Sequence, residues 1–335
     1  MADRRFPSGR FGVYGGLAMA VVMLAAGSAV QAQTQYQFTT LDDPLGTEGT
    51  ILNGTSGNII VGQYTDSLGV HHGFLSSGST FKTLDDPLAG NGANQGTIVT
   101  GIDGGNVVGT YTNGQNVLNG FEYNGSQYVT LNVPGSSQTT IGGISGTTIV
   151  GSYDNNGKVQ GFSLNGTSFT TLNSPFNPNS TFATGVSTGR IVGYASVQQL
   201  GLAGSSASGF EYDGNMYSML QDPLSDATFP TGISGNTIVG YYQLGSVDLN
   251  NFSVNGFVFD GLTYSTLNDP LGVDGTTAMG TNGTMIVGYY RDSNNMPHGF
   301  IATPIPEPTG LLGVGLCCLS LLRRRRTRLK TVADF

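Results

Sequence analysis

Aspartate is the residue type whose repetition in this chain could do chemistry. Four aspartates, each followed by proline, recur at the ends of similar segments: Asp43, Asp86, Asp222 and Asp269. Together they could attract Ca²⁺, which prefers carboxylate and amide oxygens. Aspartate before proline is also a common turn residue whose side chain bonds to the local backbone, and we favour this interpretation. The four residues are nevertheless the candidate binding face of the protein.

The same aspartates are the candidates for glycoside hydrolysis. That reaction needs two carboxyl groups about 5 to 9.5 Å apart, one of them with a raised pKa. No acidic pair differs from its copies in the other repeats, as catalytic residues would, and no Gly-x-Ser-x-Gly motif with a histidine partner is found. We expect a protein that is not an enzyme, with a glycosidase or polysaccharide lyase that uses these aspartates as the alternative.

Histidine and tyrosine supply the other possible ligands. His71, His72 and His298 show no spacing typical of a zinc site, so no metal and no other cofactor is expected. Six tyrosines follow a repeated glycine by one or two residues, and we interpret their rings as core between sheets, although such rings also stack on sugars. They are Tyr64, Tyr111, Tyr153, Tyr194, Tyr241 and Tyr289.

The elements that carry these residues are defined by an apolar motif, Ile-Val-Gly or Val-Val-Gly, which occurs six times. Its glycines lie 42 to 48 residues apart, at Gly62, Gly109, Gly151, Gly193, Gly240 and Gly288. One four-stranded blade of a β-propeller has this length. Asn-Gly and Asp-Gly pairs between β-type runs predict tight hairpins. The motif glycine predicts close approach of a neighbouring sheet, or else a β-bulge.

The two ends of the repeat array predict how it closes. The fourth strand type occurs before the first repeat, at residues 36–44, and is missing after residues 299–301. The first strand would complete the last sheet and so remove the exposed edges. We predict an all-β, six-bladed β-propeller of four-stranded antiparallel blades over residues 33–303, with an open β-solenoid as the alternative. In this order the aspartates lie at the same end of the blades as the long connections 195–208 and 243–255, a usual place for binding.

Charge and cysteine content limit the partners of the repeat region. Between residues 33 and 308 four basic residues face 19 acidic ones, a net charge of −15. Such a surface repels phosphate groups, so no nucleic acid partner is expected. Both cysteines lie near the C-terminus, so no disulfide holds the repeats together, and we expect a monomeric body.

Residues 1–32 have the pattern of a secretory signal peptide. Arg4, Arg5 and Arg10 precede an apolar stretch, and small residues lead up to Ala32. We expect export and cleavage after Ala32 by signal peptidase, with an uncleaved anchor helix as the alternative.

Residues 304–335 combine three features in a fixed order. Pro306, Glu307 and Pro308 precede 14 uncharged residues, and the arginines that follow are Arg323, Arg324, Arg325 and Arg326. The uncharged stretch is shorter than the roughly 20 residues of a membrane span. The arginines would stay on the cytoplasmic side. This predicts a short transmembrane helix that anchors the chain in the inner membrane, transiently or as a permanent tail anchor.

This order resembles the PEP-CTERM sorting signal of exopolysaccharide-producing Gram-negative bacteria. The resemblance implies recognition and cleavage by an exosortase and release to the envelope or extracellular matrix. The Gly-Phe and Thr-Leu-Asp-Asp-Pro segments within residues 36–302 are similar to HAF-type extracellular repeats. We therefore expect an exported structural or adhesive cell-surface protein that contacts exopolysaccharide. A calcium-stabilised binding module is a further alternative.

Overall fold

The computed structural model describes residues 34–177, 180–196, 207–244 and 253–306, which belong to one compact unit, Thr34–Phe335. The expected signal peptide and the tail beyond Pro306 lie outside these residues. All regular elements in the described part are β-strands, and it contains no helix that could cross a membrane. The expectation of an all-β fold is confirmed for this region.

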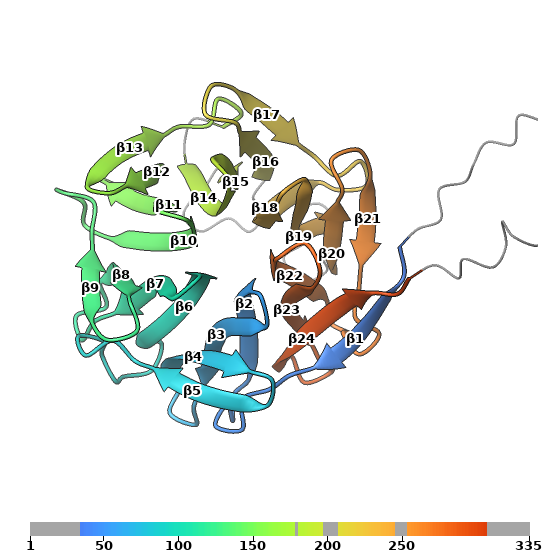
Figure 1. The fold of residues 1–335 in the computed structure, drawn as a ribbon, viewed down its shortest axis with the longest axis horizontal. Coiled ribbons are helices and arrows are strands. Elements are labelled where there is room, and N and C mark those ends of the chain that lie inside the picture. The colour runs from blue at the N-terminus through green and yellow to red at the C-terminus, as the bar shows by residue number, and fades with distance from the viewer. Residues whose placement is uncertain (1–33, 178–179, 197–206, 245–252, 307–335) are drawn as a thin grey trace, which may run out of the picture. The chain divides into compact units, whose positions relative to one another are not determined.

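Three sheets are meanders of four consecutive antiparallel strands (Figure 1). The first consists of β10 (Thr139–Ser145), β11 (Thr148–Asn155), β12 (Lys158–Asn165) and β13 (Ser168–Leu172). The second consists of β14 (Ser180–Ser187), β15 (Arg190–Ser196), β16 (Ala207–Tyr212) and β17 (Tyr217–Leu220). The third consists of β18 (Ala227–Ser234), β19 (Thr237–Leu244), β20 (Ser253–Phe259) and β21 (Tyr264–Leu267).

Eight strands form two further meanders that share one parallel bridge, between His71 and Gly96. One meander consists of β2 (Thr50–Ser56), β3 (Ile59–Thr65), β4 (His71–Ser77) and β5 (Thr80–Leu84). The other consists of β6 (Gly96–Asp103), β7 (Asn106–Thr112), β8 (Leu118–Tyr123) and β9 (Tyr128–Leu131).

The remaining sheet joins the two ends of the repeat array. Its strands are β22 (Thr276–Thr281), β23 (Ile286–Arg291), β24 (Pro297–Pro304) and, as outer strand, β1 (Tyr36–Thr40). β1 pairs antiparallel with β24, and beyond its ends Leu41 N–H donates to Gly299 O at 2.9 Å and Ile305 N–H to Gln35 O at 2.8 Å. The first strand therefore completes the last sheet, as the missing final strand predicted.

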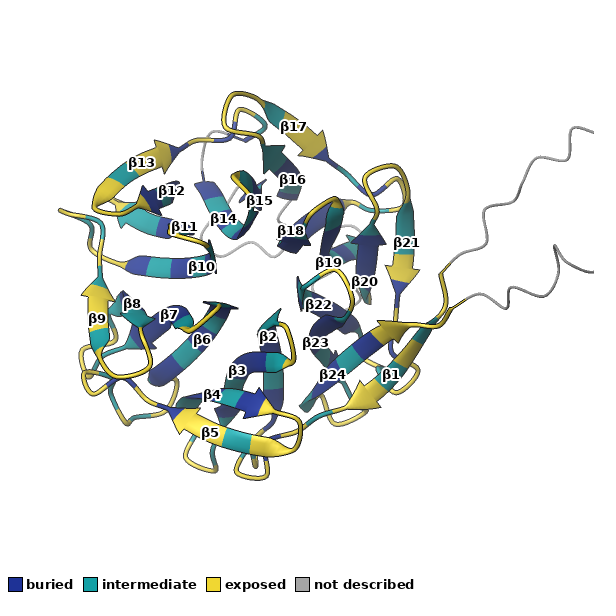
Figure 2. Ribbon diagram, in the orientation of Figure 1, coloured by how far each residue is buried: buried dark blue, intermediate teal, exposed yellow. Residues whose placement is uncertain are grey.

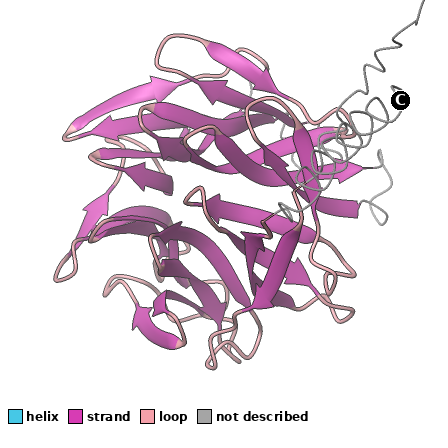
Figure 3. Cartoon of the chain, turned by 45° about the vertical axis from the view of Figure 1, so that its right-hand side comes forward, coloured by secondary structure: helices cyan, strands magenta, loops and turns pink. Residues whose placement is uncertain are grey.

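The sheets are arranged around a common axis (Figures 1 and 3). Each innermost strand lies beside the next in the order β2, β6, β10, β14, β18 and β22, and β22 lies beside β2. A linear stack would leave β2 and β22 apart, so the solenoid alternative is wrong. This radial arrangement of four-stranded antiparallel sheets is that of a β-propeller.

A buried phenylalanine in the third strand of each repeat forms the centre of the packing. These side chains have 0–1 % of their surface exposed: Phe74, Phe121, Phe162, Phe210, Phe257 and Phe300. Each contacts an aromatic ring of the adjacent outer strand, with ring centroids 5.3–5.5 Å apart, and Phe38 of β1 fills this role for Phe300. Figure 2 shows the result, with exposure concentrated on outer strands such as β5, β13 and β17.

The structure corrects the role of the motif glycine. A Cβ atom on Gly109 would lie 2.2 Å from Ile98 O of the paired strand and 2.7 Å from the ring of Phe121, both in its own sheet. The close approach therefore comes from within the sheet and not from the neighbouring one. The β-bulge lies opposite the glycine, on the innermost strand, where the register shifts between Val99 and Gly101.

Candidate functional site

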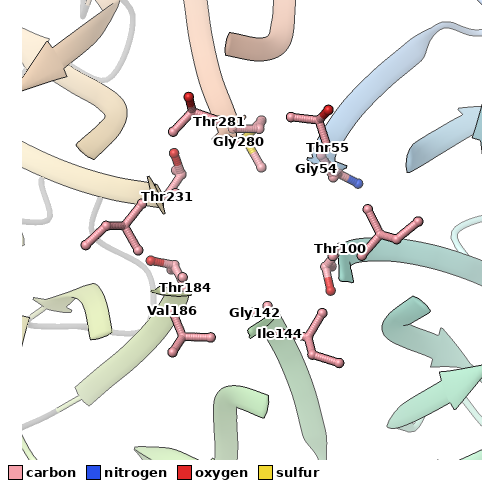
Figure 4. Close-up of a pocket in the computed structure, with 18 residues that line it drawn as sticks. Gly54, Thr55, Thr100, Gly142, Ile144, Thr184, Val186, Thr231, Gly280 and Thr281 are labelled. Carbon is pink, nitrogen blue, oxygen red and sulfur yellow. The ribbon is translucent and has the colours of Figure 1, made fainter. Parts of the chain in front are cut away.

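The innermost strands surround a central pocket with an open volume of about 410 Å³ (Figure 4). Each of these strands has a β-bulge and supplies three consecutive residues to the lining. The lining residues are 53–55, 100–102, 142–144, 184–186, 231–233 and 279–281. A bulge bends its strand and re-aims the bulged side chain. The bulges therefore place the side chains of Asn53, Thr100, Thr184, Thr231 and Met279 at the pocket wall, whereas the bulged residue of β10 is Gly142.

The bulged side chains tie one sheet to the next. Asn53 Nδ2 donates to Val99 O at 2.8 Å, Thr184 Oγ1 to Pro230 O at 2.7 Å, and Thr231 Oγ1 to Ala278 O at 2.8 Å. Each of these bonds runs from one innermost strand to its neighbour. These three side chains of the pocket wall hold neighbouring sheets together, whereas Thr55, Thr100 and Thr281 donate to carbonyl groups of their own sheets.

A second glycine makes the close contact between sheets in most repeats. It follows the bulged residue, and a Cβ on Gly232 would lie 3.0 Å from the Cα of Gly280, while one on Gly280 would lie 3.0 Å from the Cα of Gly54. Any side chain here would push neighbouring backbones apart. The sequence contains this glycine in every repeat, as Gly54, Gly101, Gly143, Gly185, Gly232 and Gly280, although a Cβ on Gly143 would meet its nearest atom only at 3.5 Å. The prediction from sequence concerned the glycine of the Ile-Val-Gly motif instead.

The pocket wall carries no carboxyl group, because its residues are Gly, Thr, Asn, Ile, Val and Met. Hydrolysis of a glycosidic bond by the mechanism considered above needs two carboxyl groups at the bond. The central pocket formed by these described residues does not supply them.

The four candidate aspartates lie at the other end of the innermost strands and are buried, with 3–4 % of their surface exposed. In each, Oδ1 accepts the N–H of the residue two places on, at 2.8–2.9 Å. Each aspartate N–H donates to a threonine hydroxyl at the start of the next strand, at 2.9–3.0 Å. These contacts are those of a turn residue. The carboxylates of Asp43, Asp86, Asp222 and Asp269 are therefore not presented to solvent as a binding face.

Burial changes the pKa of three of these aspartates. It raises the pKa of Asp43, Asp86 and Asp269, while the N–H that each carboxylate accepts acts in the opposite direction. The Oδ2 atom of Asp43 is also buried without a hydrogen-bond partner.

Polar side-chain pairs lie next to these turns, between the start of a third strand and the residue after an outer strand. In the first and last sheets the pair is histidine with aspartate: His72 Nδ1 lies 2.9 Å from Asp85 Oδ2, and His298 Nδ1 lies 2.8 Å from Asp42 Oδ2. In three other repeats the pair consists of amides: Asn119 with Asn132, Gln160 with Asn173, and Asn255 with Asn268. Sequence reasoning noted His72 and His298 but did not pair them, since the partners are 13 and 256 residues away.

Exposed leucines accompany the turns. Leu45, Leu88, Leu224 and Leu271 follow the Asp-Pro pairs and have 59–67 % of their surface exposed. Leu68, in the connection between β3 and β4 at the same end, is 73 % exposed. We call the exposed set Leu45, Leu88, Leu224 and Leu271 the leucine ring.

The six tyrosines do not form one class. Tyr64 and Tyr111, two residues after the motif glycine, are buried. Tyr194, Tyr241 and Tyr289 follow it by one residue and point to the opposite face, because side chains alternate along a strand. Tyr194 packs edge-on against Phe229 of the next sheet with ring centroids 5.0 Å apart. Burial raises the pKa of Tyr194 to about 12.

The structure does not bring the other predicted site residues together. Among the described residues no set of three or more His, Cys, Asp and Glu side chains could hold a metal ion. Pro306 is the last described residue, and it is exposed. The remaining processing residues, Ala32, Glu307, Pro308 and the arginines 323–326, lie outside the described part, as do most of the long connections 195–208 and 243–255.

No protein-family model matches the chain, and no curated protein matches its sequence. Among solved structures it is similar to the β-propeller domain of the Trilobed protease from Pyrococcus furiosus, with a TM-score of 0.47 and 9 % identity over 78 % of this chain and 84 % of that one. It is also similar to the six-bladed Aleuria aurantia lectin, with a TM-score of 0.40 and 13 % identity over 78 % and 96 %. A third similar structure is Trypanosoma rangeli sialidase, with a TM-score of 0.42 and 10 % identity over 88 % and 61 %. At these identities the likeness concerns the fold alone and assigns no activity to this chain.

Proposed function

We propose that this chain is an exported, non-enzymatic, six-bladed β-propeller that binds extracellular polymer, with exopolysaccharide as the ligand class. Its role would be structural or adhesive. The observation that carries this proposal is the leucine ring, which recurs at one end of the sheets beside the polar pairs.

We infer the number of blades from the recurrence of the four-stranded meander. Six innermost strands form the closed cycle, and six buried phenylalanines each have one aromatic partner on an outer strand. The single bridge between His71 and Gly96 then connects two blades at their loops and does not fuse them into one sheet.

A repeated surface fits a repeated ligand. Each leucine of the ring is held by the same aspartate turn, so the exposed groups recur at similar positions around the axis. We infer an interaction site from the recurrence of an exposed leucine in the same turn on one face. A polymer of identical units could contact several of them at once, and weak contacts then add up.

The enzymatic alternative has less support. The central pocket lacks carboxyl groups, and the four candidate aspartates are engaged in turns. The two histidine–aspartate pairs, which replace the amide pairs of other repeats, lie at the loop end and not in the pocket.

Binding is tested with the purified full-length chain in a polysaccharide pull-down and on a glycan array. Exchange of all four leucines of the ring to serine is expected to weaken binding at least about tenfold, since apolar contact area is lost. Met216→Ser with Leu262→Ser, on exposed residues at the opposite end, is the matched control. Equal binding by both variants, or release of reducing ends from the polysaccharide, would contradict the proposal.

The export route is a proposal of its own, supported by the order of Pro306–Pro308, the uncharged stretch and the arginines. An exosortase-type enzyme would process the tail after transient anchoring in the inner membrane. Exchange of Arg323–Arg326 to serine should leave unprocessed chain in the cell, and intact-mass measurement of secreted protein would show whether the tail is removed. Secretion of unchanged full-length chain would argue against this route.

A further inference from the structure

Both ends of the described unit leave the sheets at the same end. β24 runs from Pro297 to Pro304, and β1 begins at Tyr36, which is the register partner of Pro304. Beyond these strands Ile305 N–H donates to Gln35 O at 2.8 Å. We call this the exit end of the sheets. The leucine ring lies at the opposite end, because its turns lead into the innermost strands and the exit end is where those strands finish.

Exposed apolar side chains at the exit end lie in three successive sheets. Met216, in the turn between β16 and β17, has 68 % of its surface exposed, and Leu262, in the turn between β20 and β21, has 87 %. Ile305, directly after β24 in the closing sheet, is 48 % exposed. We call Met216, Leu262 and Ile305 the exit set.

The corresponding turns of the other three sheets are polar. Their residues 78–79, 124–127 and 166–167 are only Gly, Ser, Asn, Gln and Thr. The polar and the apolar turns both contain a glycine with positive φ, for example Gly125 and Gly261, so both kinds of residue allow the same hairpin. The fold therefore does not require apolar residues here, and they occur only on the side where the chain leaves the ring.

The turn that carries Leu262 lies close to the start of β1. Burial, and then the charge of Asp260 in this turn, raise the pKa of Tyr36. In Figure 1, β1 and β24 leave the ring beside β21, the outer strand that follows the turn. The most exposed member of the exit set therefore borders the point where the chain leaves.

Carboxylates are sparse at the exit end. Its turns contain Asp213 and Asp260, and Asp103 is the last residue of β6, while Arg190 at the start of β15 pairs with Glu211. Most other acidic residues of the described part lie at the leucine-ring end, in or next to the connections there. A negatively charged membrane surface therefore repels the leucine-ring end more strongly than the exit end.

The connection from the sheets to the uncharged stretch is short. Only residues 305–308 separate β24 from Thr309, where that stretch begins. Four residues span at most about 14 Å. The innermost strands, with six to eight residues, are about 20–26 Å long. The leucine ring is therefore farther from the exit than this connection can reach, whereas the exit set lies beside it.

We propose that the exit set contacts the lipid surface while the tail is anchored, so that the leucine ring faces away from the membrane. This inference rests on the tail anchor of the proposed export route. Met216, Leu262 and Ile305 transfer exposed apolar surface into the interfacial layer, which favours this orientation over free rotation of the body on its connection. The proposed polymer-binding face is then presented to the exterior.

The orientation is measured with tryptophan fluorescence, because the chain contains no tryptophan and one introduced indole reports a single position. Full-length Asn215→Trp, with the probe at an exposed residue beside Met216, is reconstituted into vesicles of phosphatidylethanolamine and phosphatidylglycerol. Part of the lipid carries brominated acyl chains, which quench indoles in contact with lipid. Quenching should be at least about twofold stronger than for Leu68→Trp at the leucine-ring end, because only the exit end meets the interface.

Serine variants in the Asn215→Trp chain test the exit set itself. Met216→Ser with Leu262→Ser should lower the quenching at least about twofold, since less apolar surface enters the lipid. Leu68→Ser with Val273→Ser is the matched control, on residues of similar exposure at the leucine-ring end, and should leave the quenching unchanged.

Flotation of the vesicles separates this inference from the anchor on which it rests. Chains that do not float with the vesicles would overturn the anchor and the orientation together. Floating chains in which Asn215→Trp and Leu68→Trp are quenched equally would overturn the orientation alone. Shielding of Asn215→Trp from a water-soluble quencher, without quenching by brominated lipid, would assign the exit set to a contact between proteins and would also overturn the lipid contact.

Discussion

At Gly109 an added methyl group would collide with the protein on two sides. Ile98 O and the ring of Phe121 leave no space for a Cβ, and Phe121 is itself fully buried. The same pair of glycine and phenylalanine recurs in the other repeats, for example as Gly240 with Phe257. The identity of these residues is therefore dictated by space within the sheet.

Gly109→Ala should lower the free energy of unfolding by about 1–3 kcal/mol, as overpacking of a filled core does. Gly105→Ala is the control, since a Cβ there meets nothing within 4 Å, and it should change stability by less than about 0.5 kcal/mol. Urea unfolding of both variants checks the difference. Similar losses in both would show that the clash is not the cause.

Asp86 shows how a carboxylate stabilises a turn by accepting a backbone hydrogen bond. Its Oδ1 accepts Leu88 N–H at 2.8 Å, and burial raises its pKa. The folded state therefore binds the proton of Asp86 more tightly than the unfolded chain. The resulting stabilisation is complete below the unfolded pKa and is lost as the pH rises through the folded pKa.

Asp86→Asn keeps the acceptor and removes the charge, so it should leave stability at pH 7 unchanged or higher. Asp86→Ala orphans Leu88 N–H and should lower stability by about 1–2 kcal/mol. Denaturation at pH 4 and pH 7 tests both, and wild type should lose stability relative to Asp86→Asn between these values. A loss at pH 7 in the asparagine variant equal to that of alanine would refute the turn role.

At the scale of elements, the closing sheet differs from the others in how its outer strand is connected. Phe38 of β1 meets Phe300 with ring centroids 5.5 Å apart, and in β13 Phe169 meets Phe162 at 5.4 Å. β13 follows β12 through a hairpin, whereas β1 is separated from β24 by the whole repeat region. Equal contacts therefore hold the two outer strands under different chain constraints.

Phe38→Ala and Phe169→Ala should each lower the free energy of unfolding by about 1–3 kcal/mol, less than for a fully buried phenylalanine. Only Phe38→Ala should also increase hydrogen exchange selectively in β1, because no hairpin retains that strand. Exchange mass spectrometry distinguishes local opening from overall destabilisation. Selective opening of β13 in Phe169→Ala would contradict the argument.

At the scale of the whole molecule, the described unit closes on itself through its ends. Ile305 N–H donates to Gln35 O, so the first and last described segments lie side by side (Figure 1). Pairing β1 with β24 must close a loop of more than 250 residues. The entropy of that closure opposes attachment of β1.

A circular permutant that joins residue 306 to residue 34 through a short linker, and begins at Glu48, converts β24 and β1 into a local hairpin. It should keep the fold, with a melting temperature within about 4 °C of the unpermuted 34–306 segment or above it. It should also reduce the selective effect of Phe38→Ala on β1. Loss of cooperative melting in the permutant would show that the closing sheet needs the natural connection.

The sequence alone was sufficient to predict the strand pattern and the closure of the last sheet by the first strand. The repeated apolar motif, the hairpin dipeptides and the displaced fourth strand type at residues 36–44 are local signals, and β1 does pair with β24. The favoured turn interpretation of the Asp-Pro pairs also agrees with their contacts, because Asx turns form within three residues.

Only the tertiary structure decided which residues meet across the ring. The contact between Gly232 and Gly280, the bond from Thr231 to Ala278 and the pair of His298 with Asp42 join positions 47 to 256 residues apart. A single repeat written out as sequence carries no information about which face a neighbouring sheet will touch. The tyrosines divide between two faces for the same reason, since a shift of one residue reverses the face of a strand and packing then determines what each ring contacts.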